Sequence, residues 1–281
     1  MYMKPSWNWE GHLNNLLFLP HFEGKRILLD YRLSEEAFLT ALFSIWAAKG
    51  CAVITSPFAN HPHEDLSWDV NWAQEARSVS RVKNLSFEAL RSSIFQQESL
   101  LILSTTGSSG KRKWIQFSGK QLFHSSCNFI RHFSLTPKDS TLIVLPLYHI
   151  AGLMQVIRCF NLKSPFKIAK NWRGSLSYTD HQVISLVPTQ LAKILAIPEI
   201  LAELKNYKII LVGGGGVTEQ TYLSAKRLQL PLYFSYGMTE MGATICATPL
   251  NEFPRSHNCI GVPLPATYVE VHSNLIRVKG P

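Results

Sequence analysis

The segment Thr105–Lys113 has a composition suited to binding phosphate. It reads Thr-Thr-Gly-Ser-Ser-Gly-Lys-Arg-Lys and follows an apolar run at 101–103. Glycines after a strand let backbone N–H groups approach phosphate oxygens, while the hydroxyls add donors and the basic residues add positive charge. An ordinary polar surface turn has a similar composition. The segment alone therefore leaves a phosphate-binding loop and a plain turn open.

The spacing of this segment differs from the two commonest nucleotide motifs. The Walker pattern has four residues between its glycines, whereas two residues separate Gly107 from Gly110, and Arg112 follows the lysine. The dinucleotide-binding fingerprint of glycines is absent as well. The candidate phosphate ligands in the segment are Thr105, Thr106, Gly107, Ser108, Ser109, Gly110 and Lys113.

Two later segments carry complementary chemistry. The run Gly213–Gly216 would let a flat ring lie against bare backbone. In the segment Ser235–Glu240, Tyr236 offers a stacking face, and Glu240 offers a hard oxygen ligand for magnesium that accompanies phosphates. Taken singly, the glycines fit a tight strand-to-helix turn, and Glu240 fits a solvated or helix-capping carboxylate.

Predicted strands and helices alternate along the chain. The helix expected at 34–49 has Ser34 as its N-cap and Gly50 as its terminator. This alternation predicts an α/β fold with a largely parallel sheet, in which ligands bind at the carboxyl ends of the strands. We expect the three segments as loops at those ends, and a small barrel or hairpin layer after residue 241. Strands are expected at 51–55, 100–103, 141–145, 183–187, 208–212 and 232–234, and helices at 119–133, 153–160, 188–195 and 218–228.

Length, charge and cysteine content limit the classes of protein to which the chain can belong. A chain of 281 residues with 46% hydrophobic content can bury a sizeable core. The net charge of +9 is dispersed apart from the basic residues at 111–113, which disfavours a nucleic-acid surface. No apolar run is long enough to span a bilayer, and the start of the chain lacks a signal-peptide core. Five scattered cysteines indicate neither a zinc site nor a disulfide framework, so we expect a cytoplasmic protein.

Together these segments resemble the adenylate-forming superfamily of acyl-CoA synthetases, luciferases and peptide-synthetase adenylation domains. The phosphate loop of the family is similar to Thr105–Lys113, with Arg112 in place of the usual proline and Trp114 in place of the usual glycine. Its gate motif resembles Pro146–Gly152, and its Tyr-Gly-Met-Thr-Glu signature is complete at 236–240. The glycine run at 213–216 and the pieces at 261–265 and 278–281 match as well.

The resemblance implies a fold and an activity. It implies the large N-terminal AMP-binding domain, with α/β subdomains at about 1–100 and 101–240, a β-rich subdomain at 241–281, and the family's C-terminal cap domain absent. It also implies an ATP-dependent, magnesium-using ligase that joins a small-molecule carboxylate to CoA through an acyl-adenylate; a homo-oligomer is compatible with this. The group that the chain most resembles is the o-succinylbenzoate–CoA ligases of menaquinone biosynthesis.

The resemblance also implies roles for individual residues. The phosphate loop and Lys113 would hold the β- and γ-phosphates, Thr239 the α-phosphate, and Glu240 the Mg²⁺. His149 would stand as a gate between the carboxylate and the CoA path, or be a packed histidine. The remaining nucleotide ligands would be Gly214, Gly215, Gly216, Ser235, Tyr236, Gly237 and Met238.

Three residues are expected to line the acid pocket, namely Arg158, Thr189 and Gly242. Arg158 would pair with the carboxylate of the substrate's succinyl group, unless it is a solvated helix arginine. Thr189 could instead be an ordinary helix start. Three other functions stay open: a different aryl- or acyl-CoA ligase, a non-catalytic adenylate-binding module, and a nucleic-acid binder.

Overall fold

The chain forms two compact units. The computed structural model describes residues 7, 9–17, 19–55, 67–75, 85–106, 112–169, 182–273 and 275–280. The N-terminal unit comprises residues 7–123 and 147–153, and the C-terminal unit comprises 124–146 and 154–281. Each unit is described by itself. The division into subdomains near residues 100 and 240 stays a prediction.

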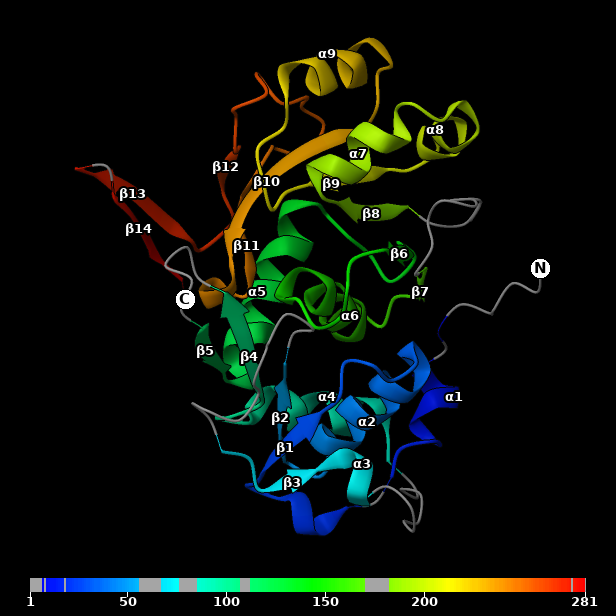
Figure 1. The fold of residues 1–281 in the computed structure, drawn as a ribbon, viewed down its shortest axis with the longest axis vertical. Helices are drawn as coiled ribbons and strands as arrows, with labels where there is room; N and C mark the ends of the chain where they lie inside the picture. The colour runs from blue at the N-terminus through cyan, green and yellow to red at the C-terminus, as the bar shows by residue number, and fades with distance from the viewer. Residues whose placement is uncertain are drawn as a thin grey trace. The chain divides into compact units, whose positions relative to one another are not determined.

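The N-terminal unit is built on a five-stranded sheet in the order β3-β1-β2-β4-β5. The first four strands are parallel, and β5 runs antiparallel to β4 (Figure 1). Its strands are β1 (Arg26–Leu29), β2 (Cys51–Ile54), β3 (Val70–Asn71), β4 (Leu101–Thr106) and β5 (Arg112–Phe117). Its helices are α1 (Trp9–Leu13), the short 3₁₀ turn Pro20–Phe22, α2 (Glu35–Ala47), α3 (Trp72–Glu75) and α4 (Phe87–Gln96).

Helix α2 begins where the sequence predicts. The Ser34 hydroxyl accepts a hydrogen bond from the Ala37 N–H at 3.3 Å, which satisfies a free donor of the first turn. Its end differs from the prediction, because Lys49 and not Gly50 takes the left-handed conformation, with φ 58°. Position 50 favours a glycine for a different reason, because a Cβ there would lie 2.6 Å from the Ile27 Cδ1 atom.

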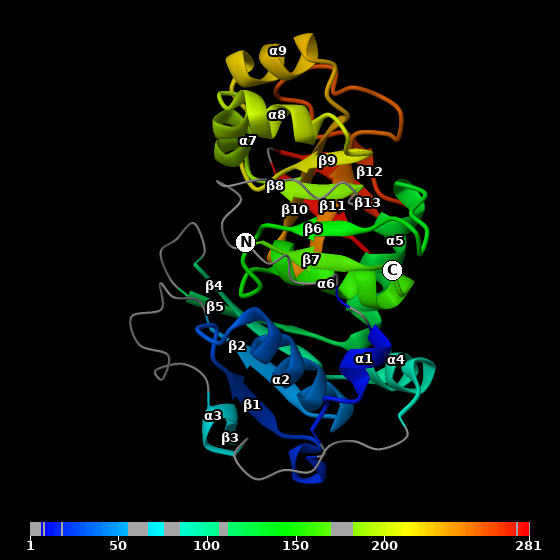
Figure 2. The same cartoon turned by 90° about the vertical axis from the view of Figure 1, so that its right-hand side faces the viewer.

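The C-terminal unit contains a seven-stranded sheet in the order β12-β11-β10-β9-β8-β6-β7. Strands β7, β6, β8, β9 and β10 are parallel, as predicted, whereas β11 and β12 are antiparallel. Figure 2 shows β7, β6, β8 and β9 one after another in this sheet. The strands are β6 (Thr141–Ile143), β7 (Phe166–Ile168), β8 (Val183–Leu186), β9 (Ile209–Val212), β10 (Leu232–Met238), β11 (Ala243–Ala247) and β12 (Val262–Pro263). The helices are α5 (Gly119–His132), α6 (Ile150–Leu162), α7 (Pro188–Ile194), α8 (Pro198–Leu204) and α9 (Glu219–Arg227).

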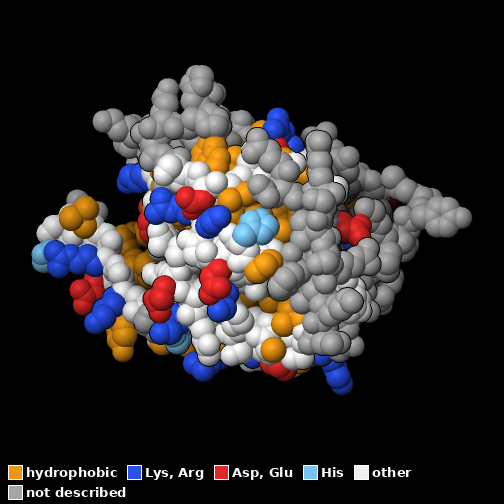
Figure 3. Space-filling view, turned by 90° about the horizontal axis from the view of Figure 1, so that it is seen from below, with side chains coloured by type: hydrophobic (Ala, Val, Ile, Leu, Met, Phe, Trp, Pro, Cys, Tyr) orange, Lys and Arg blue, Asp and Glu red, His pale blue; other side chains and the backbone are white. Residues whose placement is uncertain are grey.

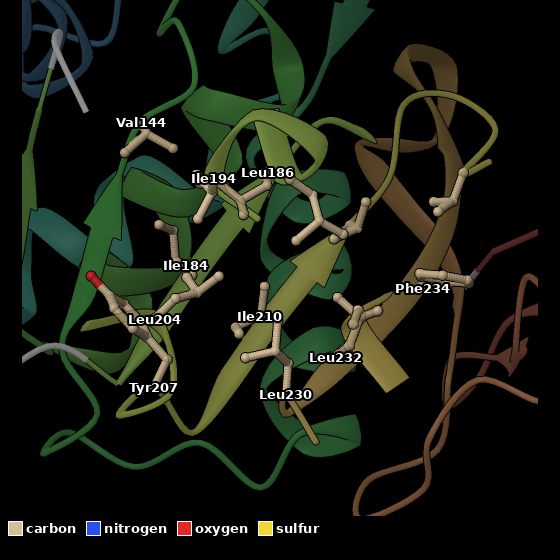
Figure 4. Close-up of a cluster of buried hydrophobic side chains, with 14 of the residues drawn as sticks. Val144, Ile184, Leu186, Ile194, Leu204, Tyr207, Ile210, Leu230, Leu232 and Phe234 are labelled. Atoms are coloured by element: carbon tan, nitrogen blue, oxygen red, sulfur yellow. The ribbon is translucent and has the colours of Figure 1, made fainter. Parts of the chain in front are cut away.

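Helices bury both faces of this sheet. Successive strand residues point to opposite faces, so Ile210 and Leu211 belong to different clusters. Residues of α7, α8 and α9 pack on one face, where the labelled side chains of Figure 4 point toward one another. Phe129 of α5 and Phe133, which directly follows α5, pack on the other face. Burial on both faces leaves the ends of the strands as the accessible part of the sheet.

The last part of the chain forms a separate hairpin of β13 (Tyr268–His272) and β14 (Leu275–Lys279). The expectation of a hairpin layer in this region is confirmed. Val271 is 74% exposed and Tyr268 is 70% exposed.

Charges are mixed on the surface face drawn in Figure 3, where Lys and Arg side chains lie among Asp and Glu side chains. The described residues on that face therefore form no basic patch of the kind that nucleic-acid binding needs. Within the described residues, no helix has the length and apolar character needed to cross a membrane.

We expect Gly119→Ala to destabilise the protein by about 1 to 3 kcal/mol, because the added Cβ would overlap the backbone of Ile94 and Phe95 at the end of α4. Gly216→Ala is the matched control, since a Cβ there meets nothing within 4 Å. Chemical denaturation of both variants checks this prediction. Equal free energies of unfolding for the two variants would contradict it.

Candidate functional site

The predicted phosphate segment is the tip of the β4–β5 hairpin. Thr105 and Thr106 were expected in a loop, but they belong to β4, because their backbones pair with Lys113 and Arg112 of β5. Thr105 is directly opposite Lys113, so their side chains lie on the same side of the two-stranded ribbon. Gly107, Ser108, Ser109 and Gly110 lie outside the described residues, as does the side chain of Thr106.

Trp114 has a structural reason to differ from the glycine of the family motif. Its side chain is half-buried and packs against a cluster of Cys51, Val53 and Ile102 on the five-stranded sheet. A tryptophan here adds apolar contact area beneath the hairpin. The departure at Trp114 therefore serves packing on the five-stranded sheet.

His149 lies just before α6, and its carbonyl oxygen accepts hydrogen bonds from the N–H groups of Gly152 and Leu153, both at 3.0 Å. The expected loop at 146–152 is therefore shorter than predicted, because the helix already begins at 150. The imidazole lies beside Tyr148, with ring centroids 4.6 Å apart. Partial desolvation lowers the pKa of His149 below its ordinary value, although the side chain remains exposed. The imidazole is therefore neutral at pH 7.

The glycine run lies at the carboxyl ends of parallel strands in the C-terminal unit. It follows β9, while Val187 follows β8 and Ser235 lies in β10, so all three are at one edge of the sheet. A Cβ on Gly214 would lie 3.7 Å from Val187, and one on Gly213 would overlap the Ser235 hydroxyl oxygen. Gly214, with φ 80°, Gly215 and Gly216 are exposed. The loop thus presents bare backbone to a ligand.

The signature segment differs from its expected loop. Ser235–Met238 belong to β10 and pair with β11, with a bulge between Tyr236 and Gly237. Gly237 approaches the partner strand so closely that a Cβ would overlap the Ala243 carbonyl. Sequence reasoning missed β11, and without β11 the segment looks like the free end of a strand. Tyr236 is half-buried and Gly237 is exposed.

The signature ends in a short 3₁₀ turn at Thr239–Met241, followed by two left-handed residues, Gly242 with φ 66° and Ala243 with φ 81°. A non-glycine residue in this conformation is strained. The Ser125 hydroxyl of α5 donates to the Gly242 carbonyl at 2.7 Å and helps to hold the turn. Glu240 is exposed, and no group of three possible metal-ligating His, Cys, Asp or Glu residues occurs among the described residues.

Thr189 is exposed in the first turn of α7, next to the glycine run. A Cβ on Gly215 would lie 3.7 Å from the Cγ atom of Pro188. The Gln190 side chain accepts a hydrogen bond from the Val187 N–H at 2.9 Å and so fixes the start of the helix. Thr189 thus lies near the glycine loop and also forms part of a helix start.

Arg158 is buried in the C-terminal unit, so the alternative of a solvated helix arginine is wrong. Only 6% of the residue is exposed. Its Cζ atom lies 3.6 Å from the centroid of the Phe129 ring, and one Nη donates to the Thr244 hydroxyl at 3.2 Å. Its Nε has no hydrogen-bond partner, and among the described residues no carboxylate forms an ion pair with it.

Burial without an anion strongly affects this guanidinium. Desolvation lowers the pKa of Arg158 to about 9. A pocket of about 10 Å³ lies beside it, lined in part by Asp139, Gln155 and Ser185, with room for roughly one water molecule. Asp139 is engaged elsewhere, because it accepts a hydrogen bond from Lys208 at 2.9 Å. The site therefore holds a buried cation whose charge an anionic ligand could compensate.

Sequence reasoning found Arg158 but missed Ser125, Phe129 and Thr244. Two of these lie on α5 and one on β11, and none stands in a motif. Ser125 is 117 positions from Gly242, and Thr244 is 86 positions from Arg158. No local pattern connects such distant residues, so only the packing of α5, α6 and β11 could have identified them.

We expect Arg158→Met to leave the free energy of unfolding of the ligand-free protein unchanged or to raise it by about 1 to 4 kcal/mol, because the variant removes a buried unpaired charge. Arg158→Lys keeps the charge but loses the planar contact with Phe129, so it should be less stable than the unsubstituted protein. Denaturant titrations of the three proteins measure the order. A strongly destabilised Met variant would contradict this account of the buried charge.

We expect an NMR pH titration of the unsubstituted protein to give a pKa below 6.5 for the imidazole of His149. A lowered pKa means that the unfolded chain binds the proton more tightly. The contribution of His149 to stability is thus complete above pH 6.5 and is lost as the pH falls. The variant His149→Gln assigns the signal, and a midpoint at or above 6.5 would show that the ring is not desolvated.

Comparison with curated proteins gives relatives with one shared name. A 2-succinylbenzoate–CoA ligase of Bacillus velezensis is 31% identical over 144 residues, which are 50% of this chain and 29% of that protein. The protein of the same name from Lactococcus lactis is 26% identical over 176 residues, which are 61% of this chain and 38% of that protein. The chain thus spans well under half the length of these two relatives.

Comparison with solved structures shows a shared fold. The o-succinylbenzoate coenzyme A synthetase (MenE) of Bacillus subtilis in complex with AMP has a TM-score of 0.69 at 18% identity, over 92% of this chain and 75% of that one. Escherichia coli MenE with a bound analogue of OSB-AMS has a TM-score of 0.71 at 16% identity, over 98% of this chain and 63% of that one. At these identities the likeness concerns the fold alone.

The family model described as "AMP-binding enzyme" matches residues 32–276. This range contains the β4–β5 hairpin, the glycine run and the signature segment, and it covers most of the chain. The expectations of an adenylate-forming family and of an α/β fold with parallel sheets are confirmed. The chain belongs to the AMP-binding enzyme family.

Proposed function

We propose that the chain is the nucleotide- and acid-binding part of an ATP-dependent carboxylate–CoA ligase whose acid is o-succinylbenzoate. The family membership and the names of the curated relatives support this proposal. The activity involves two steps, formation of an acyl-adenylate with release of pyrophosphate and then transfer of the acyl group to CoA. Because the chain spans only part of its relatives, the complete reaction belongs to the whole protein.

Arg158 is the observation that carries the choice of acid. A dicarboxylic acid keeps one carboxylate after the other has been activated, and that second group needs a cation in the pocket. Arg158 supplies a buried guanidinium without an acidic partner, and a planar fork of N–H donors suits a carboxylate. A monocarboxylic acid would leave no second carboxylate for Arg158 to pair with.

The nucleotide would bind at the exposed backbone of the glycine run. Gly214, Gly215 and Gly216 leave space for the adenine ring, and Tyr236 would stack on it. Ser235, Gly237 and Met238 would line the same edge of the sheet. Thr239 would contact the α-phosphate. In the N-terminal unit, the β4–β5 hairpin with Thr105 and Lys113 would hold the β- and γ-phosphates.

A magnesium ion bound with ATP would neutralise negative charge on the phosphates. Glu240 fits this role chemically, because it is an exposed carboxylate directly after the strand that carries the other nucleotide ligands. Phosphate oxygens and water would complete the coordination. One solved structure of Bacillus subtilis MenE is a complex with ATP and a magnesium ion; its TM-score to this chain is 0.66 at 17% identity.

His149 would act as the gate between the acid and CoA. Its lowered pKa keeps the imidazole neutral, so at pH 7 it neither repels nor binds anions by charge. Tyr148, itself packed edge-on against Tyr31, supports the ring from one side. Thr189 and Gly242 would line the acid pocket together with Arg158.

We expect Glu240→Ala and Lys113→Ala each to weaken binding of MgATP by roughly tenfold or more, because each removes a charge-assisted contact to the phosphates or their metal ion. Binding of AMP should change by less than about twofold, since AMP lacks the β- and γ-phosphates. Isothermal titration calorimetry measures both ligands.

Matched controls are Glu252→Ala and Lys120→Ala, which remove exposed charges on elements that carry no proposed ligand of the phosphates. Unchanged MgATP affinity in both Glu240→Ala and Lys113→Ala would contradict the site. Exchange of pyrophosphate into ATP with a panel of carboxylates then tests the acid, and preference for a monocarboxylate would favour a different acyl-CoA ligase.

A further inference from the structure

The orientation of the Arg158 side chain needs an explanation, because a long cationic side chain without an ion pair has several rotamers available. Asp139 lines the same small pocket, but its carboxylate accepts hydrogen bonds from the Lys208 ammonium and the Thr136 N–H, at 2.9 and 2.6 Å. The Thr244 hydroxyl oxygen accepts a hydrogen bond from one Nη of Arg158 at 3.2 Å, which is near the long end of the hydrogen-bond range. A second restraint is therefore required.

The aromatic ring of Phe129 lies in direct contact with the guanidinium. The Cζ atom lies 3.6 Å from the ring centroid, which is van der Waals contact with the face of the ring. The face of an aromatic ring carries negative charge density and attracts a cation, most strongly where water is excluded. Phe129 is 1% exposed and Arg158 is 6% exposed, so bulk water is kept from their contact.

The Phe129 ring is itself fixed in place. It packs against Phe133, which directly follows the end of α5, with ring centroids 4.7 Å apart. Phe133 in turn packs edge-on against Tyr233 of β10, with ring centroids 5.3 Å apart. All three belong to the core cluster on one face of the seven-stranded sheet. The sheet that carries the nucleotide-binding edge therefore also holds the aromatic surface under Arg158.

We propose that Phe129 is a positioning residue that fixes the Arg158 guanidinium and thereby sets the selectivity for acids with a second carboxylate. The N–H donors of a guanidinium lie in its plane and point outward from its edge. Contact of its face with the Phe129 ring therefore does not block them. Thr244 accepts from one Nη, and the buried Nε has no partner, so the guanidinium has an unused donor in the ligand-free fold that suits a planar carboxylate. This inference rests on the proposed role of Arg158 in acid binding.

The test compares two acyl-sulfamoyl adenosine ligands by calorimetry, using this chain. One carries the o-succinylbenzoyl group with its free carboxylate, and the other carries a methyl ester in place of that carboxylate. The ratio of their dissociation constants measures recognition of the second carboxylate alone, because all other contacts are shared. We expect Phe129→Leu to reduce this ratio by roughly 3- to 30-fold, the range of a desolvated cation–π contact.

Phe133→Leu is the matched control. It removes an aromatic ring from the same core cluster, four positions further along the chain, but no contact of Phe133 with Arg158 is part of the site. We expect the ratio for this variant to stay within about twofold of the unsubstituted protein. An equal loss of selectivity in both leucine variants would show a general loosening of the core and overturn the proposal.

The variant Arg158→Met distinguishes the acid-binding role of Arg158 from the positioning role of Phe129. If it abolishes the preference for the free carboxylate while Phe129→Leu retains it, the proposed acid site stands and the role of Phe129 is overturned. If Arg158→Met keeps the preference, the acid site and the role of Phe129 both fail.

A series of fluorinated phenylalanines at position 129 covers the case in which the leucine variant does not fold. Fluorine withdraws charge from the ring face with little change of shape, so the selectivity should fall stepwise with each fluorine. A flat series would overturn the proposal.

Discussion

Burial of both faces of the seven-stranded sheet is the constraint on which the candidate site depends. Helices α7, α8 and α9 pack on one face and α5 on the other, so the parallel strands can meet a ligand only at their ends. The chain places its glycine run and Ser235 at the carboxyl ends of β9 and β10. The same burial surrounds Phe129 with core side chains and keeps bulk water from Arg158. Burial of this sheet by helices thus determines both the packing of the core and the position of the candidate site.

A buried charge without a counter-charge lowers the stability of a fold, and Arg158 is such a group. The cost is reduced by contact with an aromatic face and one hydroxyl, neither of which neutralises the charge. The pKa of about 9 records the remaining desolvation. Binding of an anion would offset this cost, which links the energetics of the ligand-free fold to the acid proposed for the site.

Several elements could be predicted from local patterns. The Ser34 cap, the parallel strands β8 and β9, and helices α5, α7 and α9 follow from capping residues and apolar periodicity. Strands β5 and β11 were missed, because each begins beside glycine-rich chemistry that is typical of loops. Their pairing with β4 and β10 moved Thr105, Thr106 and Tyr236 from loops into strands. Backbone hydrogen bonds between strands outweighed local preference there.

The sequence alone indicated which residues to propose for phosphate, adenine and metal binding, because those residues stand in contiguous motifs whose composition suits that chemistry. It also indicated the α/β architecture through the alternation of apolar strands and amphipathic helices. Only the tertiary structure decided that Arg158 is buried and unpaired, and that Phe129 and Thr244 contact it. These contacts join residues far apart in sequence, and the packing of helices on a sheet leaves no local pattern in the chain.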